Sequence, residues 1–217
     1  SKLGKLHVTQ NYSISSENVS VVPFVAPFYI RSAPRKTQSE RLISGSYFFY
    51  PAQFWTHKNH LNVVRAFSII KHHSVQLVFS GAKKNGFAKV KKFIEENNLT
   101  SRVIILGYVS ESEIVDLYKN PIGVIFASFC GPTNIPPIEA ISLGKPLICS
   151  NVYAMPEQCG DAAVYFDPSK PVELANSLET ILLDSKQRNI LIKKCRKKAE
   201  EFAIENLTAR LIECLGK

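Results

Sequence analysis

Short apolar runs alternate with amphipathic segments along most of the chain, from about residue 45 to residue 185. Six runs are nearly continuous in apolar residues, as expected of strands that are buried on both faces of a sheet. They span residues 46–52, 75–81, 102–109, 123–129, 146–150 and 162–168. Between the runs, apolar residues recur at intervals of three and four, which predicts helices over 60–73, 86–99, 111–120 and 136–144. This alternation predicts an α/β fold with a Rossmann-like, doubly wound parallel sheet.

Local signals mark the ends of two predicted helices. Ser110 and Glu113 have the spacing of a capping box, and Gly144 follows an apolar helical pattern where a helix would end. Beyond Pro171 the pattern is helical to the end of the chain, and it includes a lysine-rich helix from about 185 to 205.

The first 45 residues follow a different pattern. Residues 15–30 predict a turn and one short strand, whereas the polar stretch 31–45 has no apolar period and is typical of a linker between domains. We therefore expect three parts. They are residues 1–43, the stub of a preceding N-terminal domain with its linker; residues 44–185, the Rossmann-like domain; and residues 186–217, C-terminal helices.

Composition changes this picture little. The chain has 217 residues, of which 45% are hydrophobic, so it can bury a substantial core. Its net charge of +9 favours an anionic partner, such as a phosphorylated small molecule, a membrane surface or nucleic acid. The lysine-rich stretches 83–92 and 192–198 lack the arginine-rich pattern of a nucleic-acid reader, so we favour solvated helix faces and no nucleic-acid partner.

The sequence also carries signals for the cellular compartment and for the state of its cysteines and histidines. No run of about 18 apolar residues is present, and the N-terminus has no signal-peptide core, so we expect a cytoplasmic protein. The five cysteines form no CxxC pair, which predicts reduced thiols rather than a zinc site or a disulfide framework. His57 and His60 have no Asp, Glu or Cys close by in the sequence, so structural histidines are favoured over metal ligands.

Ligands of an open parallel sheet bind beyond the carboxyl ends of its strands. The loop before the helix at Pro136 is the most informative, because the backbone N–H groups and the dipole at a helix N-terminus favour an anion. Pro136 and Pro137 have no N–H, so we expect Thr133 and Asn134 to supply the donors, from their backbone and their side chains. Glu139 can accept hydrogen bonds from sugar hydroxyls, so a ribose that carries a diphosphate would use both features. In the alternative interpretation, Asn134 only caps the helix and Glu139 is a surface acid.

Two further loops hold candidate residues. Lys58 lies just ahead of a helix, where it could meet a diphosphate as a point charge, or it is an ordinary surface lysine. Glu157 and Gly160 predict an exposed turn. The chain has no HExxH, Walker A or GxGxxG motif and no Ser-His-Asp order, so zincins, P-loop enzymes, Rossmann dehydrogenases and serine hydrolases have no support.

Together the motifs resemble the C-terminal, donor-binding half of retaining nucleotide-sugar glycosyltransferases with the GT-B fold, known as family 4 or group 1. The resemblance covers residues 44–185 and rests on four segments in the expected order. They are "PAQFWTHKN", "LVFSG", "VIILGYVSESEIVDLYKN" and "FCGPTNIPPIEAISLGKPLICSNVYAMPEQCGDAAVYFDP". Upstream, "KLHVTQNYSISSENVSVVPF" resembles the last segment of the N-terminal half.

The resemblance implies roles for charged positions. Lys58 matches a lysine that neutralises the donor diphosphate, and Gln53 stands where the family usually has a partner arginine. Glu139 matches the second glutamate of an E-x7-E motif, which holds the ribose. The first glutamate, which normally contacts the transferred sugar, falls on Gly131.

The remaining site residues follow from the same resemblance. Thr133 and Asn134, with the adjacent Ile135, would take over from the missing acid in a subset of the family that carries Gly-Pro-Thr-Asn. The nucleotide cleft would be lined by Gly81, and the base would be cupped by Gly107, Tyr108 and Val109.

The implied activity is retaining hexosyl transfer from a nucleotide-diphosphate sugar to an acceptor glycan or lipid-linked glycan, in bacterial surface polysaccharide or lipopolysaccharide synthesis. Glu139 and Lys58 are the catalytic candidates, and neither a metal nor another cofactor is expected, because the departing diphosphate is stabilised electrostatically. Without the N-terminal acceptor domain we expect this chain to be inactive. The positive charge is compatible with peripheral contact at the inner face of the cytoplasmic membrane. The alternatives are a nucleotide-sugar 2-epimerase-like enzyme and a non-catalytic nucleotide-binding module.

Overall fold

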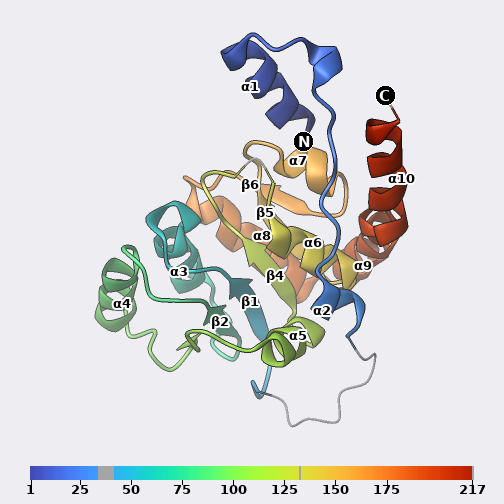
Figure 1. Cartoon of the computed structure of the whole chain (residues 1–217). Helices are drawn as coiled ribbons and strands as arrows, with labels where there is room; N and C mark the ends of the chain where they lie inside the picture. The colour runs from blue at the N-terminus through green and yellow to red at the C-terminus, as the bar shows by residue number, and fades with distance from the viewer. Residues whose placement is uncertain (34–41, 132, 217) are drawn as a thin grey trace.

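A parallel six-stranded sheet forms the centre of the computed structural model, which describes residues 1–33, 42–131 and 133–216. The strand order is β3-β2-β1-β4-β5-β6 (Figure 1). The strands are β1 (Tyr47–Pro51), β2 (Gln76–Ser80), β3 (Val103–Ile105), β4 (Gly123–Phe126), β5 (Leu147–Ser150) and β6 (Val164–Phe166). Each lies within one of the six apolar runs, so the predicted Rossmann-like, doubly wound sheet is confirmed.

Helices follow the strands and cover both faces of the sheet. They are α3 (His60–Ile69), α4 (Phe87–Glu96), α5 (Glu111–Lys119), α6 (Ile135–Ser142), α7 (Met155–Cys159), α8 (Pro171–Leu183), α9 (Ser185–Ala199) and α10 (Ile204–Leu215). Helix α3 packs against α4 and α8, whereas α6 packs against α9 (Figure 1). The predicted capping box of Ser110 and Glu113 begins α5, and Gly144, with φ of 62°, follows α6.

The centre of the sheet determines where a ligand can bind. Strands β1 and β4 are parallel neighbours, with Phe49 opposite Val124. From β1 the chain continues outward to β2, and from β4 it continues in the opposite direction to β5. The loops after β1 and β4 therefore diverge and leave a crevice at the carboxyl ends of these strands.

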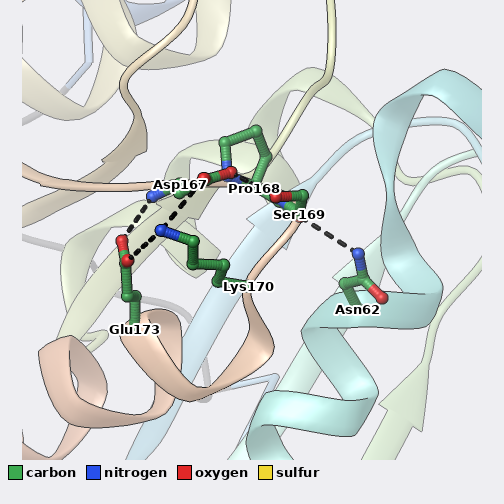
Figure 2. Close-up of polar contacts among 6 residues, drawn as sticks. All are labelled: Asn62, Asp167, Pro168, Ser169, Lys170 and Glu173. Atoms are coloured by element: carbon green, nitrogen blue, oxygen red, sulfur yellow. Dashed lines mark hydrogen bonds and ion pairs between the residues drawn. The ribbon is translucent and has the colours of Figure 1, made fainter.

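The loop between β6 and α8 is tied to α3. The Asn62 side-chain amide donates a hydrogen bond to the Pro168 carbonyl at 3.0 Å, as Figure 2 shows. Beside this contact, Lys170 lies between Asp167 and Glu173, with N···O distances of 3.5 and 3.0 Å (Figure 2). These three charges lie toward solvent, so their ion pairs stabilise the fold little. The bond to Pro168 holds the start of α3, and with it the end of the loop that follows β1.

The N-terminal region differs from the prediction. It contains α1 (Lys2–Tyr12), the 3-10 turn η1 (Ser16–Asn18) and α2 (Phe28–Arg31). The prediction of a strand within 15–30 is wrong. Residues 19–27 do not pair with either edge strand of the sheet, β3 or β6, so they lack the hydrogen-bond partners that a strand needs. Helix α1, which was not predicted, has no buried residue. Most of the expected linker lies outside the described residues, and the domain boundaries at 43 and 185 stay predictions.

One core residue gives the fold a dependence on pH. His60 stacks on Phe54 with ring centroids 4.1 Å apart, and its Nε2–H donates to the Ala52 carbonyl at 3.1 Å. Its Nδ1 is buried and has no hydrogen-bond partner among the described residues. Burial lowers the pKa of His60 from 6.5 to about 3, so the folded state holds a neutral imidazole.

We predict that acid destabilises the protein through this histidine. Because the folded pKa is the lower one, stability is unaffected by His60 above about pH 6.5 and falls by up to about 1.4 kcal/mol per pH unit between that value and about pH 3. Replacement His60→Gln should reduce the slope of unfolding free energy against pH in this range, because one fewer proton binds on unfolding. His7→Gln on the exposed helix α1 is the control, and equal slopes in all three proteins would contradict the prediction.

Candidate active site

A cleft of about 250 Å³ lies at the carboxyl ends of β1 and β2. Its walls come from these strand ends, from the loop after β3, from the start of α6 and from α2. The lining residues are Tyr29, Pro51, Ala52, Gln53, Ser80, Gly81, Ala82, Tyr108, Val109, Ile114, Ile135, Pro136 and Glu139. Six of the predicted site residues are therefore brought together here, from segments that are far apart in the sequence.

Gly81 allows two strand ends to approach each other in the wall of the cleft. Its φ is 140°, in a region that L side chains rarely adopt, and a Cβ atom would lie 2.4 Å from the Ala52 carbonyl oxygen. The Gly81 N–H donates to the Gly107 carbonyl at 2.6 Å. Gly107 thus supports the wall through its backbone, whereas its neighbour Tyr108 is 88% exposed at the rim.

Glu139 is the acidic residue of the cleft, and it lies in α6 with only 4% of its surface exposed. The Tyr118 hydroxyl donates to Oε2 at 2.5 Å, and the Tyr29 hydroxyl donates to Oε1. Burial raises the pKa of Glu139, while the two tyrosine hydrogen bonds act in the opposite direction. The interpretation of Glu139 as a surface acid is therefore wrong. A buried carboxylate that lines a cleft is a candidate for ligand binding.

Lys58 does not itself line the cleft, but its side chain lies against Asn134, the neighbour of the lining residue Ile135. It ends the 3-10 turn η2 (Thr56–Lys58), and its Nζ lies 3.4 Å from Asn134 Oδ1 and 5.2 Å from the centre of the Phe126 ring. Burial lowers the pKa of Lys58. Among the residues that the structure describes, no carboxylate forms an ion pair with it. A half-buried cation without a counterion, beside the N-terminus of α6, favours an anionic ligand.

Asn134 occupies the N-cap position of α6, but its side chain makes no capping hydrogen bond. Instead its Oδ1 faces Lys58. Its backbone N–H, which we expected to face a diphosphate, donates to Gln158 Oε1 at 3.1 Å, and Gln158 Nε2 donates back to the Asn134 carbonyl at 2.7 Å. The anion site therefore depends on side chains and on the helix dipole more than on this amide.

Gly131 has a structural reason to be glycine. Its φ is 140°, and a Cβ atom there would lie 2.5 Å from Asn134 Nδ2. The Asn134 side chain thus fills the space next to the position where the resemblance expects an acid. Pro132, the neighbour in this turn, lies outside the described residues.

Other predicted positions lie away from the cleft. Thr133 lines a separate cavity of about 410 Å³, together with Phe24 of the N-terminal region and Phe202 before α10. Glu157 is exposed, as predicted, but it lies in the short helix α7 (Met155–Cys159) and not in a turn. Glu157 in its first turn accepts the Lys2 N–H at 2.6 Å and so caps α1.

Sequence reasoning missed the two tyrosines that hold Glu139. Tyr118 belongs to the apolar face of α5, where its pattern is that of an ordinary core residue. Tyr29 is 110 positions from its partner, and no motif marks it. The described residues contain no cluster of three His, Cys, Asp or Glu side chains that could hold a metal ion, and the prediction of a metal-independent reaction stays a prediction.

Solved structures with the same architecture include glycosyltransferases. A glycosyltransferase from Rickettsia africae superimposes with a TM-score of 0.88 at 20% identity, over 98% of this chain and 60% of that one. HepE from Anabaena, solved in complex with UDP and glucose, superimposes with a TM-score of 0.73 at 18% identity, over 78% of this chain and 48% of that one. The fold is therefore the Rossmann-like fold that was expected for one half of a GT-B glycosyltransferase.

Sequence comparison identifies the family. Residues 36–198 match the family described as "Glycosyl transferases group 1". The chain therefore belongs to the group 1 glycosyl transferases. It is 26% identical over 178 residues to the O-antigen chain mannosyltransferase B of Escherichia coli, an alignment that covers 81% of this chain and 47% of that protein. The chain thus spans about half the length of this curated relative.

We predict that Gly81→Ala destabilises the fold far more than Gly107→Ala. Both glycines have positive φ, but the new Cβ atom would meet rigid backbone at position 81, whereas nothing lies within 4 Å at position 107. The expected losses in unfolding free energy are about 3 kcal/mol or more and about 1 kcal/mol, respectively. Denaturant unfolding measures both values, and equal losses would show that the close approach to Ala52 is relaxed in solution.

We also predict that Gly131→Ala lowers stability by about 1–2 kcal/mol, and that part of this loss comes from Asn134. In an Asn134→Ala background the contact with the side chain is gone, so the same substitution should cost measurably less. Denaturant unfolding of the four proteins of this cycle gives the coupling. Additive losses would mean that the asparagine does not explain the glycine.

Proposed function

We propose that this chain is the donor-binding half of a retaining hexosyltransferase that moves a sugar from a nucleotide-diphosphate sugar to an acceptor glycan or lipid-linked glycan. The observation that carries the proposal is that the buried Glu139 carboxylate lines the cleft on α6, while Lys58, which forms no ion pair among the described residues, contacts Asn134 at the N-terminus of the same helix. A nucleoside diphosphate carries ribose hydroxyls, which can donate to a carboxylate, and next to them a diphosphate, which a cation can bind. The HepE complexes with UDP and glucose support such a ligand for this fold.

Each element of the site has a chemical role in this proposal. The base lies against Tyr108 and Val109, the ribose hydroxyls donate to Glu139, and the diphosphate lies near Lys58 and the N-terminus of α6. As the bond to the transferred sugar breaks, negative charge builds on the leaving diphosphate, and Lys58 with the helix dipole stabilises it. No protein nucleophile and no metal ion or other cofactor are needed for this chemistry.

Two positions of the site are uncharged where the family resemblance expects an arginine and a glutamate. Gln53 lines the cleft where an arginine was expected, and its Oε1 accepts the Trp55 indole N–H at 3.1 Å. Gly131 leaves the sugar position without a carboxylate, so Asn134 is the polar side chain that remains there, while the role of Thr133 stays a prediction. These changes are the observation that favours a second candidate function, a nucleotide-binding module without transferase activity. The epimerase-like alternative has no specific observation in its favour.

The acceptor and the cellular setting are proposed from the family. We propose that the acceptor binds mainly to an N-terminal domain and that this chain alone binds donor without transferring sugar. Tyr12, Phe28 and Leu215 are large apolar side chains that are mostly exposed, and a further domain would shield such side chains from water. The O-antigen relative supports a role in bacterial surface polysaccharide or lipopolysaccharide synthesis. We propose a cytoplasmic location with peripheral membrane contact, and no helix in the described part of the chain is long and apolar enough to cross a bilayer.

Calorimetry with UDP-, GDP- and ADP-sugars tests the donor site. We expect one of these ligands to bind, and Glu139→Gln and Lys58→Gln each to weaken binding by about 10- to 100-fold, because each removes a charged hydrogen-bonding partner. Lys91→Gln on the exposed face of α4 is the matched control for the loss of one positive charge. Binding that is indifferent to both site substitutions would refute the site. Release of free sugar from the bound donor would favour an enzyme over a binding module.

We further predict that Glu139→Gln stabilises the fold while it impairs binding. The folded pKa of Glu139 lies above the ordinary value of 4.5, so stability falls as the pH rises from about 4.5 through the folded pKa. Glutamine keeps partners for Tyr29 and Tyr118 without the buried charge. At neutral pH its unfolding free energy should exceed that of the wild type by about 1 kcal/mol, and the difference should shrink in acid. A less stable variant at neutral pH would contradict this account.

A further inference from the structure

We propose that the hydroxyl of Tyr29 occupies the place of a ribose hydroxyl on Glu139, so that a nucleotide binds by displacing this side chain. The inference rests on the function proposed above for the cleft. It assigns to α2, a segment outside the Rossmann-like sheet, a direct part in setting the affinity for the nucleotide.

The two tyrosines on Glu139 are not equivalent. Tyr118 is fully buried within α5 and holds Oε2 from inside the protein, at 2.5 Å. Tyr29 is half-buried, lines the cleft and holds Oε1. A ligand that enters the cleft therefore finds this oxygen already bonded to a hydroxyl. Tyr118 orients the carboxylate, whereas Tyr29 competes for it.

A phenol and a ribose hydroxyl make the same kind of bond to a carboxylate. Burial, the hydrogen bond to Glu139 and the charge of that carboxylate all raise the pKa of Tyr29, so its hydroxyl stays a donor throughout the physiological range. Exchange of one O–H···carboxylate bond for another leaves the buried charge satisfied at every stage. Displacement therefore avoids the penalty of an unpaired buried carboxylate.

The anchoring of α2 allows the side chain to leave without loss of the helix. Ile30 is buried, and the N–H of Ala26 donates to the Phe202 carbonyl at 3.2 Å, so the segment is held on both sides of Tyr29. Helix α2 packs against α5 and α6 beside the cleft (Figure 1). In the displacement that we propose, the Tyr29 side chain rotates about χ1 and frees Oε1 while the anchored backbone stays in place.

If Tyr29 competes with the ribose for Glu139, the effect of Tyr29 on nucleotide affinity depends on the ribose hydroxyls. A nucleoside diphosphate with both hydroxyls can replace the tyrosine on the carboxylate, but a 2′,3′-dideoxy analogue cannot. Removal of the Tyr29 hydroxyl should therefore favour the first ligand and have no effect on the second.

The test is calorimetry on the full chain at mildly alkaline pH, with UDP, GDP and their 2′,3′-dideoxy analogues. Tyr29→Phe should bind the ribonucleotide about three- to tenfold more tightly than the wild type and should bind the dideoxy analogue with unchanged affinity. Tyr153→Phe, which removes the hydroxyl of an exposed tyrosine outside the lining of the cleft, is the matched control and should change neither affinity.

The outcomes separate this assignment from the proposed function. If the wild type binds a nucleoside diphosphate and Tyr29→Phe binds it equally or more weakly, Tyr29 positions Glu139 instead of competing for it, and the assignment is overturned. A gain for both ligand types overturns it as well, because the hydroxyl would then only obstruct the cleft. If no protein in the series binds UDP or GDP while the ADP-sugar does, the ADP pair replaces them. If no nucleotide binds at all, the function proposed for the cleft fails, and the assignment fails with it.

Discussion

The candidate site depends on one interaction, the hydrogen bonds that hold the buried carboxylate of Glu139. A lone carboxylate among apolar side chains is strongly unfavourable, and this one is tolerated because a tyrosine hydroxyl reaches each of its oxygens. One of these donors comes from α5, inside the α/β layers, and the other comes from α2, outside them. The chemistry of the cleft is thus linked to a segment that does not belong to the sheet.

A second constraint is the close approach of backbone and side chains at two glycines. Gly81 brings the ends of β1 and β2 together, and Gly131 leaves room for Asn134 beside Lys58. At position 131 a side chain would collide with Asn134, so the missing carboxylate and the neighbouring asparagine belong to one arrangement. Under the proposed function, the site keeps a carboxylate for a sugar hydroxyl and a cation for an anion, with less charge around the sugar to be transferred.

Much of the fold could be predicted because its signals are local. Strands buried on both faces must be apolar throughout, so the six runs stood out, and Ser110 with Glu113 marked the start of α5 within four residues. The expected strand within 15–30 failed because a strand needs a partner, and local β propensity does not show whether an edge is available. Helix α7 was missed because a single turn leaves almost no periodicity to detect.

The amino-acid sequence by itself determined the doubly wound sheet and the edge of the sheet where the cleft lies, because parallel strands place their carboxyl ends together. Most of the six predicted residues of the cleft followed from the family resemblance, which matches residues in sequence and needs no geometry. Only the tertiary structure decided the state of the site. The Tyr29 hydroxyl donates to Glu139, the Asn134 N–H donates to Gln158, and Thr133 lines another cavity. Each of these depends on contacts between segments far apart in the chain, whose directions no local pattern of residues specifies.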